Sequence, residues 1–182
     1  MASEGPNNGA TWNSQAFPVF PWEDPINAQF SDDIYTFCEL GSLDDNSDLL
    51  TGSNFGFAIP GGSTIDGFLL EVERKCQVSA IQDIGVQLFI GATLSANRSA
   101  GAIWPLVDTF QSFGGAADTW GFAAALLTPA NINDELFGCA LACANVTGVG
   151  DFAFIDNARI TVFFTEASGS VGWQAMGMGR PQ

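Results

Sequence analysis

The chain has 182 residues, of which 47% are hydrophobic and 14% charged, so it can bury the core of one domain and is not a disordered chain. Its 20 acidic and 5 basic residues give a formal net charge of −15, which argues against nucleic acid and anionic membranes as partners. The sequence contains no histidine, which excludes histidine-dependent catalytic triads and histidine metal sites.

Residues 1–25 predict an extended N-terminal arm rather than a helix or a paired strand, because they hold four of the eight prolines. The arm is also rich in large apolar side chains, so we expect it to lie against its own domain or a neighbouring subunit. The first residues have neither a basic nor an apolar segment, and we expect no secretory signal. The residues expected to contact a partner are Trp12, Phe17, Phe20 and Trp22.

Residues 1–48 carry nine acidic residues and no Lys or Arg. The segment is interpreted as a solvated face, or as a surface that docks electrostatically on a basic partner. Calcium binding by 44–48 is a weaker alternative, because this run of oxygen ligands lacks the Gly and the bidentate Glu of an EF-hand loop. We therefore predict no metal site and no cofactor.

Residues 26–166 predict a single all-β domain, an antiparallel, jelly-roll-like β-sandwich. Apolar and polar residues alternate with the period of a half-buried strand, and glycine-rich turns separate the segments. One helical turn is expected over 128–133, with Thr128 as its N-cap. The clearest strands are 68–73, 84–90, 137–143 and 159–164, and shorter ones are expected at 34–40, 54–59, 119–126 and 152–156.

The four cysteines are interpreted as reduced, buried, small apolar residues. Cys139 and Cys143 are four positions apart in a predicted strand, which separates their Cα atoms by about 13 Å. A disulfide requires less than about 7 Å, so these two cannot pair with each other.

Residues 167–182 predict a glycine-rich C-terminal tail, and Trp173, Met176 and Met178 are its expected partner contacts. We identify no catalytic residue, because pairs of carboxylates are common among twenty acids and no other catalytic pattern is present. Phe89 and Phe163 fall on the outward phase of their strands. They are interpreted as packing against a neighbouring sheet or subunit, with sugar binding as the alternative.

The ordered motifs of residues 22–165 resemble a β-sandwich module of tailed-bacteriophage virion proteins. Two departures are the apolar run Phe122–Leu127 and the pair Phe163-Phe164 in place of the usual Tyr-Tyr. The resemblance brings no catalytic position with it. The motifs that carry it are Trp22–Ala28, Ser31–Tyr35, Ser53–Gly67, Glu71–Lys75, Gly114–Gly121, Thr128–Asn133, Phe137–Leu141 and Asp156–Phe164.

The resemblance implies a non-enzymatic virion component made in the cytoplasm of a host bacterium. The shortness of the chain and its two arms favour a capsid decoration or cement protein on the outer capsid surface. Its expected partners are the major capsid protein and further copies of itself, as a dimer or a trimer, with neither nucleic acid nor membrane. The alternative is a carbohydrate- or receptor-binding β-sandwich module associated with a tail or fibre.

Overall fold

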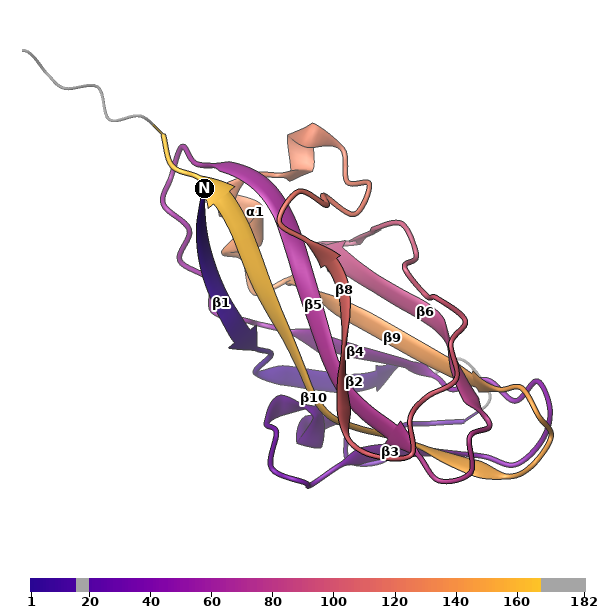
Figure 1. The fold of residues 1–182 in the computed structure, drawn as a ribbon. Coiled ribbons are helices and arrows are strands. Elements are labelled where there is room, and N and C mark those ends of the chain that lie inside the picture. The colour runs from indigo at the N-terminus through magenta and orange to yellow at the C-terminus, as the bar shows by residue number, and fades with distance from the viewer. Residues whose placement is uncertain (16–19, 168–182) are drawn as a thin grey trace, which may run out of the picture.

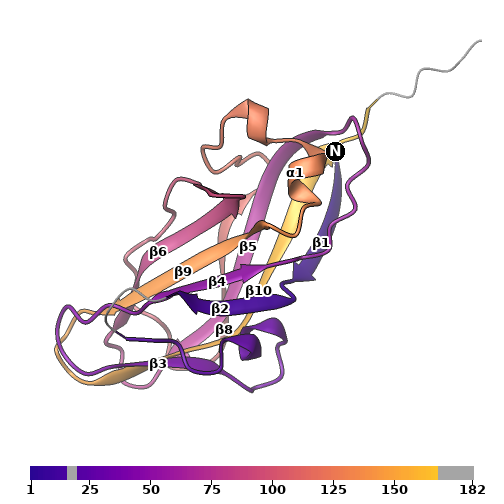
Figure 2. The same ribbon diagram turned by 180° about the vertical axis from the view of Figure 1, so that it is seen from behind.

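A computed structural model describes residues 1–15 and 20–167 of the chain. Two antiparallel sheets of five strands each lie face to face and enclose the core (Figures 1 and 2). The predicted antiparallel β-sandwich is therefore confirmed. The N-terminus and the end of the last strand lie at one end of the sandwich, and β3 lies toward the other (Figure 1).

The first sheet is built around the longest strand, β10, which covers Asp151–Thr165. β5 (Thr64–Cys76) pairs along one edge of β10, and β8 (Thr109–Gly115) pairs with β5. On the other edge of β10, β1 (Ala2–Asn8) pairs with its C-terminal half and β3 (Thr36–Leu40) with its N-terminal residues. The β3 end of this sheet therefore combines residues from three distant parts of the chain.

The second sheet has the order β2-β4-β9-β6-β7. Its central strand is β9, Phe137–Asn145, which pairs with β4 (Leu49–Ser53) on one side and β6 (Ile81–Ile90) on the other. The edge strands are β2 (Thr11–Gln15) and the short β7 (Thr93–Leu94). The alternating side chains that face the first sheet are apolar and fill the space between the two sheets.

Three short helices complete the described fold: η1 (Pro25–Gln29), η2 (Ala124–Leu126) and α1 (Pro129–Ile132). The backbone N–H of Asn131 donates to the side chain of Thr128 at 3.2 Å, so the predicted N-cap is confirmed. All four cysteines are buried and unpaired, as their sequence context indicates.

The structure corrects the prediction of an unpaired N-terminal arm over residues 1–25, because residues 2–8 and 11–15 of this segment form paired strands. β1 and β2 are edge strands of the two sheets, so the sandwich begins at Ala2 rather than at residue 26. Pro6 fits into β1 because the pairing shifts in register between Glu4 and Asn7. A proline that has no N–H to donate is tolerated at such an irregularity in an edge strand.

Two of the shorter predicted strands are also wrong. Residues 54–59 form no strand. Asn54 N–H donates to the backbone carbonyl of Glu135 at 3.0 Å, and Ile59 N–H donates to Asn133 Oδ1 at 2.8 Å. Residues 119–126 form a turn followed by η2, and Trp120 of this turn is completely buried. Both segments are apolar because they cover one end of the core, which alternation alone does not distinguish from strand packing.

Candidate functional site

The sequence-predicted partner residues do not form one site in the structure. Trp12 and Trp22 are buried in the protein's own core, 6% and 3% exposed, which leaves them no surface for a partner and corrects that prediction. Phe20 packs partly against the same core and lines a hollow of the surface. Phe17, Trp173, Met176 and Met178 lie outside the described residues.

The two phenylalanines considered for sugar binding lie on different sheets. Phe89 of β6 is half-buried and lines a shallow hollow of about 250 Å³ on the outer face of the second sheet, beside Thr51 and Leu94. Phe163 is half-buried on β10 of the first sheet. Their positions on separate sheets give no joint binding surface.

A different group of aromatic side chains does form a continuous surface, on the outer face of the first sheet where β3 meets β10. The inward-facing neighbours Cys38 and Ala153 are completely buried, whereas the aromatic residues between them are half-buried. This aromatic surface consists of Tyr35, Phe37, Phe152 and Phe154.

Strand register explains why these rings meet. Phe37 lies directly opposite Phe154 across the β3–β10 pair, and their ring centroids are 6.2 Å apart. Phe152 is two residues from Phe154 on the same face, with nearly parallel rings whose centroids are 6.0 Å apart. The ring of Tyr35 meets Phe154 edge to face at 5.6 Å. Such contacts hold each ring in place, so the surface is ordered before any ligand binds.

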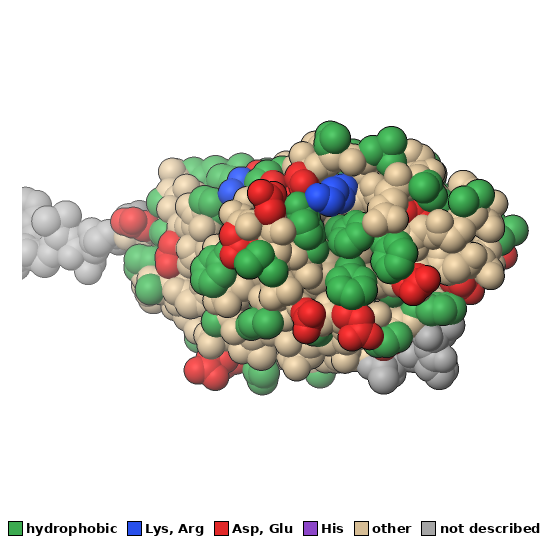
Figure 3. All heavy atoms as spheres, turned by 90° about the horizontal axis from the view of Figure 1, so that it is seen from below, with side chains coloured by type: hydrophobic (Ala, Val, Ile, Leu, Met, Phe, Trp, Pro, Cys, Tyr) green, Lys and Arg blue, Asp and Glu red, His purple; other side chains and the backbone are tan. Residues whose placement is uncertain are grey.

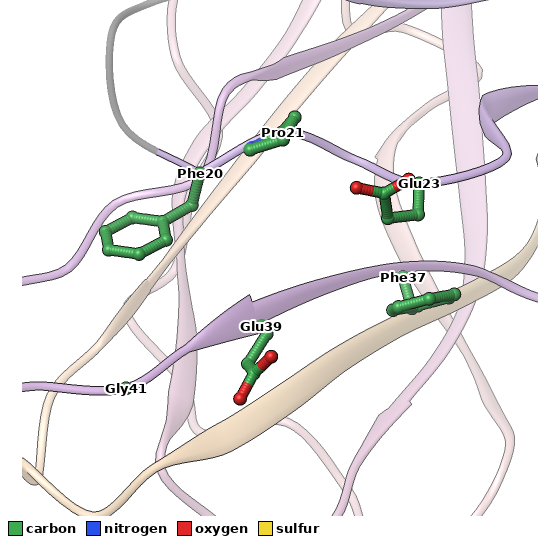
Figure 4. A pocket seen from close by; sticks show the side chains of 6 residues that line it. All are labelled: Phe20, Pro21, Glu23, Phe37, Glu39 and Gly41. Carbon is green, nitrogen blue, oxygen red and sulfur yellow. The ribbon is translucent and has the colours of Figure 1, made fainter.

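A hollow of about 410 Å³ adjoins the aromatic surface on the side away from β10 (Figure 4). Glu23 is the direct backbone partner of Phe37, through N–H···O bonds of 2.8 and 3.3 Å, and Glu39 follows Phe37 by two residues on the same face. Both carboxylates are exposed. We call this the acidic hollow, and its lining residues are Phe20, Pro21, Glu23, Phe37, Glu39 and Gly41.

A second hollow, of about 590 Å³, adjoins the surface on the β5 side and includes the exposed residues Leu106 and Val107. Lys75 Nζ donates to the Tyr35 hydroxyl at 2.7 Å and to Asp108 Oδ2 at 2.9 Å. Burial alone lowers the pKa of Lys75, but these two bonds outweigh it and raise the pKa. For Tyr35 burial has the opposite effect, because it raises the pKa and keeps the phenol neutral. Lys75 is therefore a fixed cation whose charge Asp108 balances.

The space-filling view from below shows hydrophobic side chains gathered in the middle of this face, with acidic side chains around them and a basic one beside them (Figure 3). Water can solvate carboxylates at such a rim, whereas exposed aromatic rings are energetically unfavourable in water. A continuous apolar surface inside a charged rim is typical of a binding site.

The sequence contained a signal for this surface. Residues 34–40 and 152–156 were predicted as strands, and each places aromatic side chains on the phase opposite to its buried Cys or Ala residues. The sequence does not indicate that β3 pairs with β10, and this pairing brings residues 37 and 154 together. That pairing joins segments more than 100 residues apart, and no local pattern specifies it.

Residues 1–15 and 20–167 give less support for a metal site than for the aromatic surface. No group of three or more acidic or cysteine side chains there is arranged to hold a metal ion. In the segment 44–48, Asp45 instead accepts a hydrogen bond from the backbone N–H of Ser42 at 2.7 Å. No helix in the described part of the chain has the length and apolar character needed to cross a membrane.

No protein-family model matches the chain, and no curated protein matches it. Among solved structures it is similar to a CBM4 structure (TM-score 0.39, 10% identity, 82% of this chain and 91% of the other). It is also similar to TmCBM61 in complex with β-1,4-galactotriose (0.45, 9%, 85% and 93%). A third is the N-terminal cellulose-binding domain of β-1,4-glucanase C from Cellulomonas fimi (0.34, 10%, 87% and 88%). At these values the likeness concerns the fold alone and carries no argument about function.

Proposed function

We propose that the protein is a non-catalytic binding module that binds carbohydrate through its aromatic surface. The observation that carries the proposal is the set of four adjacent aromatic side chains, half-buried and held in place by ring contacts, on the outer face of the first sheet. Sugar rings present flat C–H faces that pack against aromatic rings. Pre-ordered rings lower the entropic cost of that packing.

The polar groups around the rings suit the hydroxyl groups of a sugar. The carboxylates of Glu23 and Glu39 accept hydrogen bonds, and both lie beside Phe37. Charge-assisted hydrogen bonds of this kind are stronger than those between neutral groups, so they can orient a sugar that the rings hold by contact area. The two hollows beside the rings provide room for more than one sugar unit.

The charge of the surface restricts the class of carbohydrate. The formal net charge of the chain is −15, and Lys75, the cation at this site, is already paired with Asp108. Sulfated, phosphorylated or carboxylated glycans would therefore be repelled. We expect neutral or basic glycans to bind.

A glycan array followed by calorimetry on the strongest neutral ligand tests the proposal. We expect Phe37→Ala to weaken binding at least tenfold, because Phe37 contacts Phe154, adjoins Glu23 and lines the acidic hollow. Phe89→Ala is the matched control, since it removes a half-buried phenylalanine from the other sheet. We expect it to leave the affinity unchanged.

Two results would contradict the proposal. One is a wild-type protein that binds no glycan on the array. The other is loss of binding in Phe89→Ala with full binding in Phe37→Ala, which would transfer the site to the second sheet. Circular dichroism of both variants ensures that a loss of affinity does not reflect unfolding.

A second candidate function is that of a virion structural protein, most specifically a capsid decoration or cement protein. It is supported by the resemblance of residues 22–165 to a module of tailed-phage virion proteins. The aromatic surface with its acidic rim would then dock on a basic part of the major capsid protein, and self-association as a dimer or trimer would add contacts. The burial of Trp12 and Trp22 removes two of the arm contacts on which this interpretation depended.

Antibody-gold labelling of particles from the source organism, viewed by electron microscopy, tests this second candidate. Label distributed over the heads is the expected result for a decoration protein. Label confined to tail tips would replace that function with receptor binding by a tail or fibre protein. Particles without label would exclude both placements and leave carbohydrate binding as a function outside the virion.

A further inference from the structure

The four basic residues of the described part of the chain share one kind of environment. Each forms an ion pair with a carboxylate, and each also lies over an aromatic ring, within the range of a cation–π interaction. The groups are Arg74 with Asp83 and Trp104 (4.8 Å to the ring centroid), Lys75 with Asp108 and Tyr35 (3.9 Å), Arg98 with Asp118 and Trp120 (5.9 Å), and Arg159 with Glu71 and Phe110 (4.0 Å).

The acidic hollow contains the same two components. Phe37 supplies the aromatic ring, with Glu23 opposite it across the backbone bridge and Glu39 beside it along β3 (Figure 4). Within residues 1–15 and 20–167, no basic side chain pairs with either carboxylate. This group of residues therefore has the composition of the other four without a cation from the described part of the chain.

Further carboxylates increase the negative potential at the hollow. Cys38 lies on β3 between Phe37 and Glu39, and its thiol contacts the carbonyl oxygen of Phe20 at 3.4 Å. Burial, which is the largest cause, and the charges of Asp48, Glu23, Asp45 and Glu39 together raise the pKa of this thiol to about 12. Four carboxylates thus contribute negative potential at Cys38, directly behind the hollow. The same potential would stabilise a positive charge in the hollow.

We propose that the acidic hollow binds the protonated amino group of an amino sugar, an inference that rests on the proposed carbohydrate binding. The ammonium group lies over the Phe37 ring, with Glu23 and Glu39 as its carboxylate partners. The ring of the same or the next sugar unit packs on Phe152 and Phe154. Two-thirds of the residues that line the hollow are Phe, Pro or Gly. The two carboxylates are therefore the charged groups that recognise the ammonium group.

Calorimetry with two ligands of equal length tests this inference: a glucosamine oligosaccharide and its fully N-acetylated counterpart. The titrations are made at about pH 5.5, where the free amines of the sugar are protonated. We expect the wild-type protein to bind the amine form about tenfold more tightly. In Glu23→Gln/Glu39→Gln we expect the two ligands to bind with equal affinity.

The control is Glu135→Gln, which removes one exposed carboxylate at a distance from the hollow and should retain the preference. Equal affinity of the wild-type protein for both ligands would overturn the inference and leave the proposed carbohydrate binding intact. Failure of both ligands, together with a blank glycan array, would overturn the proposed function itself. A lysine-rich peptide that binds more tightly than the amino sugar, with the same dependence on Glu23 and Glu39, would show that the amine belongs to a protein partner and overturn the sugar assignment.

Discussion

Carboxylates lie beside aromatic rings in two regions, one between the two sheets and one on the outer face of the first sheet. The two regions differ chiefly in exposure to water. Between the sheets, Arg74 pairs with Asp83, and their side chains are only 3% and 2% exposed. Trp104 Nε1 donates to Asp83 at 3.0 Å, and the guanidinium group lies 4.8 Å from the Trp104 ring and 5.4 Å from Phe113. The two charges of this buried cluster are thus paired within the protein, although Arg74 Nε and Asp83 Oδ2 have no hydrogen-bond partner.

On the outer face, Glu23 and Glu39 flank Phe37, and water rather than a cation of the described chain surrounds their carboxylates. Burial explains the difference, because a charge removed from water is costly unless another charge compensates for it. Burial raises the pKa of Asp83 even though Arg74 and Trp104 act to lower it, as expected for a carboxylate removed from water. The same chemical groups thus stabilise the fold when they are buried and remain available to a ligand when they are exposed.

The largest effect should follow from breaking the buried cluster. We expect Arg74→Met to lower the free energy of unfolding by about 3–5 kcal/mol, because it leaves Asp83 as a buried charge without its partner. Urea denaturation followed by tryptophan fluorescence measures the change. A loss below about 1 kcal/mol would mean that water reaches Asp83 and that the cluster is not closed.

The double variant Arg74→Met/Asp83→Leu separates the two causes of that loss. It removes both charges and keeps apolar volume between the sheets, so we expect it to recover most of the stability. If it is as unstable as the single variant, then packing of the Arg74 side chain against Trp104 and Phe113, rather than the lost ion pair, determines the effect.

The sandwich could be predicted from the sequence wherever a strand is long and has one buried face. Residues 68–73 lie within β5 and 159–164 within β10, and in both segments the inward phase is almost completely buried. Alternation of this kind depends on one face being dry and the other wet, which is a local property of the sequence. The capped turn at Thr128 was predictable for a similarly local reason.

Edge strands were harder to predict because their residues do not alternate regularly or because they include the Gly and Pro that normally end a strand. β1 contains Gly5 and Pro6, which normally end strands, yet its pairing with β10 is interrupted just there and resumes afterwards. β8 places Phe110 and Phe113 three positions apart, and its outer residues are exposed. Tertiary pairing with β10 and β5 determines these strands, and the sequence alone does not reveal that pairing.

The candidate site was predictable only in part. Outward alternation singles out Phe89 and Phe163, interpreted as packing contacts with sugar binding as the alternative, and it does not single out Phe37 and Phe154. Periodicity identifies which side of a strand a residue occupies. It does not identify which strands are neighbours, and a surface made from β3 and β10 depends on that neighbourhood.

The smallest change in stability should come from a substitution in the aromatic surface. Its size decides whether this surface is a binding site or a part of the core. We expect Phe152→Ser to lower the free energy of unfolding by only about 0.5–1 kcal/mol, because Phe152 is half-buried on the outer face. Phe68→Ala on the inner face of the same sheet is the comparison. Phe68 is completely buried, so this variant should lose about 3–5 kcal/mol.

Urea denaturation of both variants gives the two values under the same conditions. A Phe152→Ser variant as unstable as Phe68→Ala would show that the exposed rings stabilise the sandwich as a second core, and their exposure would then need no ligand to explain it. A small loss means that the fold does not depend on Phe152, although the ring leaves apolar surface in contact with water. An aromatic residue with little effect on stability at a surface of this kind is best explained by what it binds.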